Sequence, residues 1–72
     1  EVHREIIAAI EKLPPERRKI VELSMMGFSQ EEIADKLEIS VNTIKTQKRK
    51  AYVFLREELQ HLFVFLLFVL NL

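Results

Sequence analysis

The sequence predicts an all-α domain of four helices, and three features support this fold class. The 72 residues include one glycine and two prolines, which leaves little room for the turns that join strands. Apolar residues recur at three- and four-residue intervals through most of the chain. Two serines, Ser29 and Ser40, each precede a segment of helical spacing. Two helix starts this close together predict a helix-turn-helix.

Prolines and the glycine bound the first two predicted helices. The first helix ends near Leu13 and carries four apolar residues at helical spacing: Val2, Ile6, Ile7 and Ile10. Proline is well tolerated at the first position of a helix, so we expect the second helix to run from Pro15 to Met26. It should stop at Gly27, the only glycine available for a left-handed residue.

A capping box predicts the start of the third helix. In such a box the side chains of Ser29 and Glu32 would each satisfy a backbone donor of the first turn, so the helix should begin at about Gln30. Its core-facing residues would be Ile33, Ala34 and Leu37. Ile39 then fills the corner before the next helix.

Ser40 can cap a long fourth helix, because no proline or glycine interrupts residues 41–59. At 100° per residue, one side of this helix should pack on the core: Val41, Ile44, Lys48, Ala51 and Leu55. The opposite side is free to meet a partner: Asn42, Thr46, Arg49, Lys50 and Val53.

Charge is distributed unevenly along this neutral chain. Residues 1–38 carry nine acids and six bases, whereas no acid occurs between Ile39 and Arg56. Five bases give that stretch a local charge of +5: Lys45, Lys48, Arg49, Lys50 and Arg56. A basic face on a neutral domain attracts polyphosphate, and an α-helix fits the major groove of B-DNA. The alternative is that the polar face is simply solvated, but the capped helix before it and the tight turn favour nucleic acid.

Four segments, in this order and spacing, resemble region 4 of the sigma factors of bacterial RNA polymerase, most closely the extracytoplasmic-function group. They are residues 13–18, 28–34, 40–45, and Ala51 with Leu55-Arg56, and the likeness runs from about residue 7 to 59. The resemblance implies a helix-turn-helix domain of the winged-helix-like, three-helical-bundle type. It also implies a cytoplasmic transcription initiation subunit whose last helix reads the −35 promoter element. The implied partners are double-stranded promoter DNA, the β flap of RNA polymerase core, and an anti-sigma factor.

Carried over by position, the DNA-contacting places of the family fall on the face that helical spacing selects: Asn42, Thr43, Lys45, Thr46, Arg49 and Lys50. Two residues depart from the family pattern. Glu38 stands where such turns often have glycine, so we expect backbone strain or a rearranged turn there. Lys48 replaces an aliphatic residue, and its stem should cover the core while its ammonium reaches solvent or phosphate.

Output domains of response regulators of the LuxR/NarL type share the four-helix plan and are the nearest alternative. Both kinds of domain bind promoter DNA, but the proline-rich segment after Leu13 and the ending at Leu55-Arg56 favour the sigma interpretation. A full sigma factor also needs a region for the −10 element, so we expect residues 1–60 to form an isolated C-terminal DNA-binding domain.

Residues 61–72 form an apolar tail, which includes nine consecutive apolar residues from Leu62 to Leu70. As a helix these nine would span roughly 14 Å, too short for a bilayer core of about 30 Å. We expect the fourth helix to run on past His61 into this tail, and residues 59–72 to associate with a second copy. Alternatives are docking on an N-terminal region, contact with an anti-sigma factor, and shallow membrane association.

Nothing in the sequence favours catalysis, a cofactor or a metal. His3 and His61 lie near opposite ends of the chain without ligands at suitable spacing, and both are expected at the surface. The basic run Arg17-Arg18-Lys19 is expected to be solvated or, under the sigma interpretation, to touch the DNA backbone. The absence of cysteine fits a reducing compartment.

Overall fold

Five α-helices make up the computed structural model, which describes residues 2–71 except the side chain of Phe63. They are α1 Val2–Glu11, α2 Pro15–Met25, α3 Gln30–Leu37, α4 Val41–Glu58 and α5 Gln60–Leu70. No strand occurs within residues 2–71, so the predicted all-α class and the helix-turn-helix, formed by α3 and α4, are confirmed. The four predicted helices correspond to α1–α4, and the tail forms a separate fifth helix, α5. Leu72 and the side chain of Phe63, both part of the predicted tail, lie outside the described residues.

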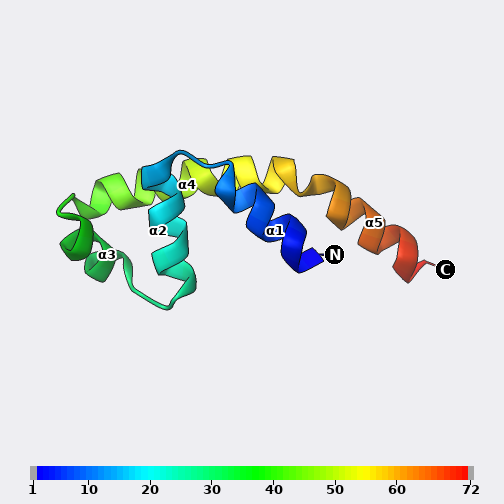
Figure 1. Cartoon of the computed structure of the whole chain (residues 1–72), viewed down its shortest axis with the longest axis horizontal. Helices are drawn as coiled ribbons and strands as arrows, with labels where there is room; N and C mark the ends of the chain where they lie inside the picture. The colour runs from blue at the N-terminus through cyan, green and yellow to red at the C-terminus, as the bar shows by residue number, and fades with distance from the viewer. Residues whose placement is uncertain (1, 72) are drawn as a thin grey trace.

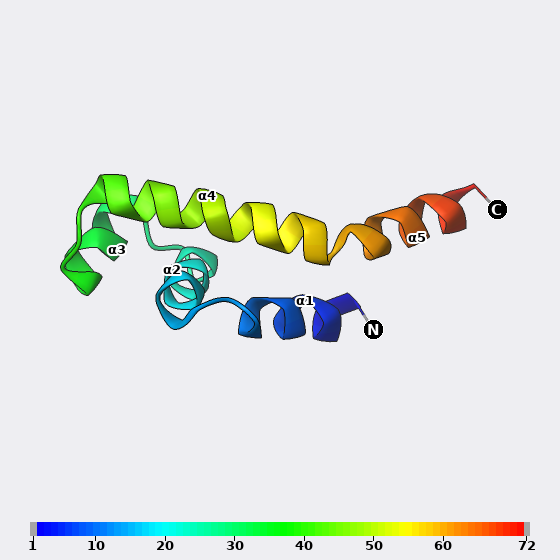
Figure 2. The ribbon, with the colours of Figure 1, turned by 90° about the horizontal axis from the view of Figure 1, so that it is seen from above.

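The long helix α4 organises the molecule, and α1, α2 and α3 pack against it (Figure 1). The molecule measures 48 × 19 × 18 Å. In both Figure 1 and Figure 2, α3 and the start of α4 lie at one end, whereas α5 extends past the N-terminus at the other. The radius of gyration is therefore 14.2 Å, against about 11 Å for a compact chain of this length.

Two apolar clusters form the core, and both are built around α2 and α4. The first lies beneath the helix-turn-helix and consists of Ile20, Leu23, Ile33, Ala34 and Ile44. The second lies between α1, α2 and α4 and consists of Ile10, Leu13, Val21 and Ala51, with Ile6, Phe54 and Leu55 packed around it. Ile20 and Val21, adjacent in α2, serve different clusters, so this helix joins the two halves of the core.

The ends of α2 follow the prediction closely. Pro15 occupies its start, and the helix ends at Met25, one residue before the predicted end. Gly27 has a φ of +97°, a backbone conformation that a side chain disfavours, so glycine provides the turn out of α2.

The predicted continuous helix through residues 41–70 is interrupted at Leu59. Its φ of −99° and ψ of 6° depart from helical values, and Leu62 N–H donates to the Leu59 carbonyl at 3.0 Å in a tighter turn. Two contacts flank the joint: Lys12, the residue after α1, pairs with Glu58, and His61 Nε2 lies 3.3 Å from Glu5 Oε2 of α1. One of these contacts lies on each side of Leu59. No glycine or proline marks this joint in the sequence.

Candidate nucleic-acid interface

The start of α3 is fixed by the predicted capping box. Ser29 Oγ accepts from Glu32 N–H at 3.1 Å, and Ser29 N–H donates to Glu32 Oε1 at 2.8 Å. The hydrogen bond with the backbone of Ser29 and, to a smaller extent, the hydrogen bond with its side chain lower the pKa of Glu32 below its usual value. The carboxylate is therefore held in its charged form at the N-terminus of α3, where negative charge is favourable.

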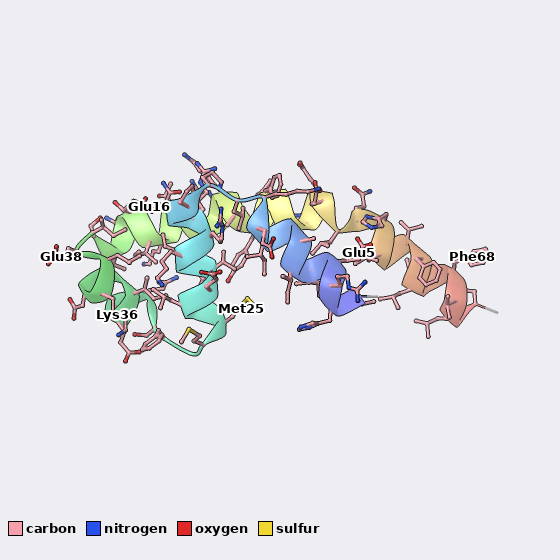
Figure 3. The ribbon with its side chains drawn as sticks, in the orientation of Figure 1. Glu5, Glu16, Met25, Lys36, Glu38 and Phe68 are labelled. Atoms are coloured by element: carbon pink, nitrogen blue, oxygen red, sulfur yellow. The ribbon has the colours of Figure 1, made fainter. Side chains whose placement is uncertain are left out.

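The turn between α3 and α4 contains the strain expected at Glu38. Its φ of 57° and ψ of 43° lie in the left-handed region, which costs an L-residue roughly 1–2 kcal/mol. This conformation lets Ile39 N–H donate to the Ala34 carbonyl at 3.1 Å and close the end of α3. Figure 3 shows Glu38 at the tip of the molecule, far from Phe68 on α5.

Ser40 caps α4 as predicted, because its Oγ accepts from Thr43 N–H at 3.0 Å. The same oxygen also lies 2.8 Å from Thr43 Oγ1. The hydroxyl of Thr43 is therefore occupied by the cap, and Thr43 is half-buried. Asn42, in the same first turn of α4, is exposed.

The two sides of α4 separate clearly by exposure. Ile44 and Ala51 are fully buried, and Val41 and Leu55 are partly buried against the two core clusters. Four of the six residues predicted to contact DNA are exposed: Asn42, Lys45, Arg49 and Lys50. Thr46 and Thr43 are half-buried. Asn42, Lys45, Thr46 and Arg49 follow one stripe of the helix, while Lys50 and Thr43 flank it.

A basic hollow extends this stripe along α4 as far as Arg56. It has a volume of about 550 Å³ and is lined by Gln30, Lys45, Lys48, Arg49, Tyr52, Val53 and Arg56. Four of these seven residues are cations and none is acidic, so the hollow suits an anion such as a phosphate. Lys48 is half-buried, and its Nζ lies 5.8 Å from the centroid of the Tyr52 ring, within range of a cation–π contact.

Sequence reasoning included Arg56 in the basic stretch but missed Gln30 and Tyr52 as members of this hollow. Tyr52 could have been found, because Lys45, Arg49, Tyr52 and Arg56 follow one another at helical spacing. Gln30 belongs to α3 and reaches the hollow only through the crossing of the two helices, which spacing along one helix does not reveal.

The basic run of α2 is only partly solvated. Arg17 Nε donates to Gln47 Oε1 at 2.7 Å and so links α2 to α4. Arg18 Nη2 donates to the Leu13 carbonyl at 3.2 Å. Both arginines are half-buried, while Lys19 is exposed. The expectation of a solvated run is therefore wrong for Arg17 and Arg18, which stabilise helix contacts.

The two histidines lie apart from this interface. His3 and His61 are exposed as expected, and within residues 2–71 no cluster of three or more metal-ligating side chains occurs. In the same part of the chain, no helix has both the length and the apolar character needed to cross a membrane.

Residues 3–55 match the family described as "Sigma-70, region 4". This span includes α1 from His3 onward, all of α2 and α3, and α4 through Leu55. Comparisons with curated proteins and with solved structures gave no match. The family match covers all six predicted contact residues and excludes α5.

Proposed function

The chain belongs to the sigma-70 region 4 family, and we propose that it recognises the −35 element of bacterial promoters as the C-terminal domain of an extracytoplasmic-function sigma factor. The family role is DNA binding in promoter recognition, without catalysis.

The exposed basic face of α4 is the observation that supports the proposal. Asn42 and Arg49 lie two helical turns apart on the side opposite the buried Ile44 and Ala51. Arginine can donate two hydrogen bonds to guanine, and asparagine can pair with adenine in the major groove. We propose that Asn42, Thr46 and Arg49 face the base edges, and that Lys45 and Lys50 contact phosphates.

Thr43 has a different role in this proposal. Its hydroxyl contacts Ser40 in the cap, so Thr43 supports the position of the first turn of α4 near the DNA backbone. The other cations of the hollow, Lys45, Lys48 and Arg56, would follow the phosphate backbone away from the base contacts. Because phosphate contacts release counterions, affinity should fall steeply with salt.

Two protein partners belong to the same proposal. Under it, the domain contacts the β flap of RNA polymerase core in the bacterial cytoplasm, and an anti-sigma factor would act by covering the same surfaces. A second candidate role, association between copies of the chain through residues 59–72, is favoured by the exposed apolar side chains of α5.

The test is a selection of bound sequences from random duplex DNA, with the chain alone and with RNA polymerase core added. We expect an enriched motif that is positioned at −35 spacing when polymerase is present. A two-fold symmetric motif bound without polymerase would favour an output domain of the LuxR/NarL type. No enrichment in either arm would contradict promoter recognition by this chain.

A further inference from the structure

Helix α5 carries a large apolar surface that the fold leaves uncovered. It contains no charged residue, and none of its described side chains is buried. Seven consecutive side chains are between 43 % and 79 % exposed: Val64, Phe65, Leu66, Leu67, Phe68, Val69 and Leu70. Figures 1 and 3 show this helix extending beyond α1 and away from the packed helices.

An apolar groove lies beside the beginning of α5. It has a volume of about 720 Å³. Six apolar residues line it, from α1, from the end of α4, from the joint at Leu59 and from α5: Val2, Ile6, Leu55, Leu59, Leu62 and Leu66. Arg56, Glu57 and Gln60 supply its polar rim. The groove and the exposed helix therefore form one continuous apolar surface at this end of the molecule.

The size of this surface matches that of a protein interface. A large apolar side chain presents roughly 150–200 Å² when fully exposed, so the seven residues leave on the order of 600–800 Å² uncovered. A monomeric protein seldom leaves more than a few hundred Å² of contiguous apolar surface, whereas a standard interface covers about 800 Å² on each partner.

We propose that the occupant is a second copy of this chain, with α5 of each copy lying in the groove of the other around a two-fold axis. A helix that is apolar on every side needs apolar cover on more than one side. Pairing of two α5 helices alone would cover one side of each. Reciprocal exchange gives each α5 the partner's α5 together with the partner's α1 and α4, and a two-fold arrangement closes without leaving a free groove.

This dimer is independent of the proposed promoter recognition. Residues of α3 and the start of α4 lie at the opposite end of the molecule from α5 (Figure 1). The dimer would therefore leave Asn42 and Arg49 of both copies accessible, and loss of either function should leave the other measurable.

Sedimentation equilibrium of the complete chain over a wide dilution series tests the proposal. We expect a mass twice that of one chain, which falls to the single-chain mass on dilution. Phe68→Asp should weaken association about tenfold or more, because a charge would be buried in an apolar interface. Met25→Asp is the matched control, since Met25 is equally exposed, at 66 % against 67 % for Phe68, but lies at the end of α2 (Figure 3).

A second pair of variants tests the groove. Val2 lines it and is 46 % exposed, whereas Ile7 lies on the same helix, is 42 % exposed and does not line it. Val2→Asp should weaken association at least about tenfold, and Ile7→Asp should leave it unchanged. Circular dichroism should show that all four variants keep their helical content, because every substituted side chain is exposed.

Three results would overturn the proposal. The unmodified chain could show the single-chain mass at every concentration. Binding of that chain to lipid vesicles would then favour a membrane surface as the partner of α5. Phe68→Asp could keep the dimer mass, which would remove α5 from the interface. Val2→Asp could behave as Ile7→Asp does, which would exclude insertion of α5 into the groove.

Discussion

Helices α4 and α5 follow each other directly in the chain but differ in how their apolar residues are used. In α4, Ile44 and Ala51 are fully buried, whereas in α5, Leu70 remains 79 % exposed. The buried apolar residues of α4 lie on one side, which α1, α2 and α3 cover, whereas the opposite side is mostly polar and leaves only Val53 and Tyr52 as exposed apolar residues. Helix α5 has apolar residues on every side and extends beyond these helices. Burial thus depends on an available partner surface, and apolar content alone does not determine it.

The same contrast separates two kinds of binding surface. The start of α4 is held by a serine cap, and the helix presents charged and amide side chains at its surface. Helix α5 has no side-chain cap at its start, and it presents only apolar surface beyond His61. The first arrangement suits recognition of a polar, charged partner, and the second suits association by removal of apolar area from water.

The largest expected effect is on the free energy of unfolding, when one apolar side chain is truncated in the packed domain and one in α5. Ile33→Ala should lower the free energy of unfolding by about 2–5 kcal/mol, because Ile33 is fully buried under α4 and its removal leaves a cavity. Leu67→Ala on α5 should change it by at most about 0.5 kcal/mol at dilutions where the chain is monomeric. Urea unfolding measures both values. Equal losses would show that α5 packs on the domain as tightly as α3 does.

A smaller effect on stability is expected at the strained turn between α3 and α4. Glu38→Gly should raise the free energy of unfolding by about 0.5–1 kcal/mol, since glycine relieves the left-handed strain but adds entropy to the unfolded chain. Glu38→Ala is the control, because it removes the charge and keeps the strain. If urea denaturation gives Glu38→Ala the same increase in the free energy of unfolding as Glu38→Gly, the increase comes from removal of the charge.

The smallest effect concerns the capping box of α3. The pKa of Glu32 is lowered in the folded chain, so its contribution to stability is present above about pH 4.3, the usual pKa of glutamate, and is lost as pH falls through the lowered pKa. The stability difference between the unmodified chain and Glu32→Gln should therefore shrink on acidification. Unfolding curves at several pH values measure it. A difference that stays constant down to low pH would argue against an ionised cap.

The sequence predicted most of the local structure at the end of the molecule that contains the helix-turn-helix. Ser29, Ser40 and Gly27 act through local backbone geometry, which spacing along the chain reveals, and their predicted roles are confirmed. The strain at Glu38 was also predictable, because a residue with a Cβ occupies a position that requires a left-handed turn.

The joint at Leu59 and the full extent of the basic hollow could not be predicted in this way. The joint is flanked by pairs between residues 46 and 56 positions apart, Lys12 with Glu58 and Glu5 with His61. Gln30 enters the hollow from a neighbouring helix. Such features depend on tertiary contacts, which the periodicity of a single helix does not encode. The DNA-contacting roles of the six α4 residues remain a prediction.

The most direct test of the account is the affinity of Arg49→Ala for a duplex carrying the selected −35 motif and for a scrambled duplex at one salt concentration. We predict a loss of roughly 1–3 kcal/mol on the selected duplex and a much smaller change on the scrambled one, because Arg49 is proposed to read bases. Arg4→Ala, which removes an exposed arginine from α1, should leave both affinities unchanged. Equal weakening of both duplexes by Arg49→Ala, or no weakening, would contradict base recognition by α4.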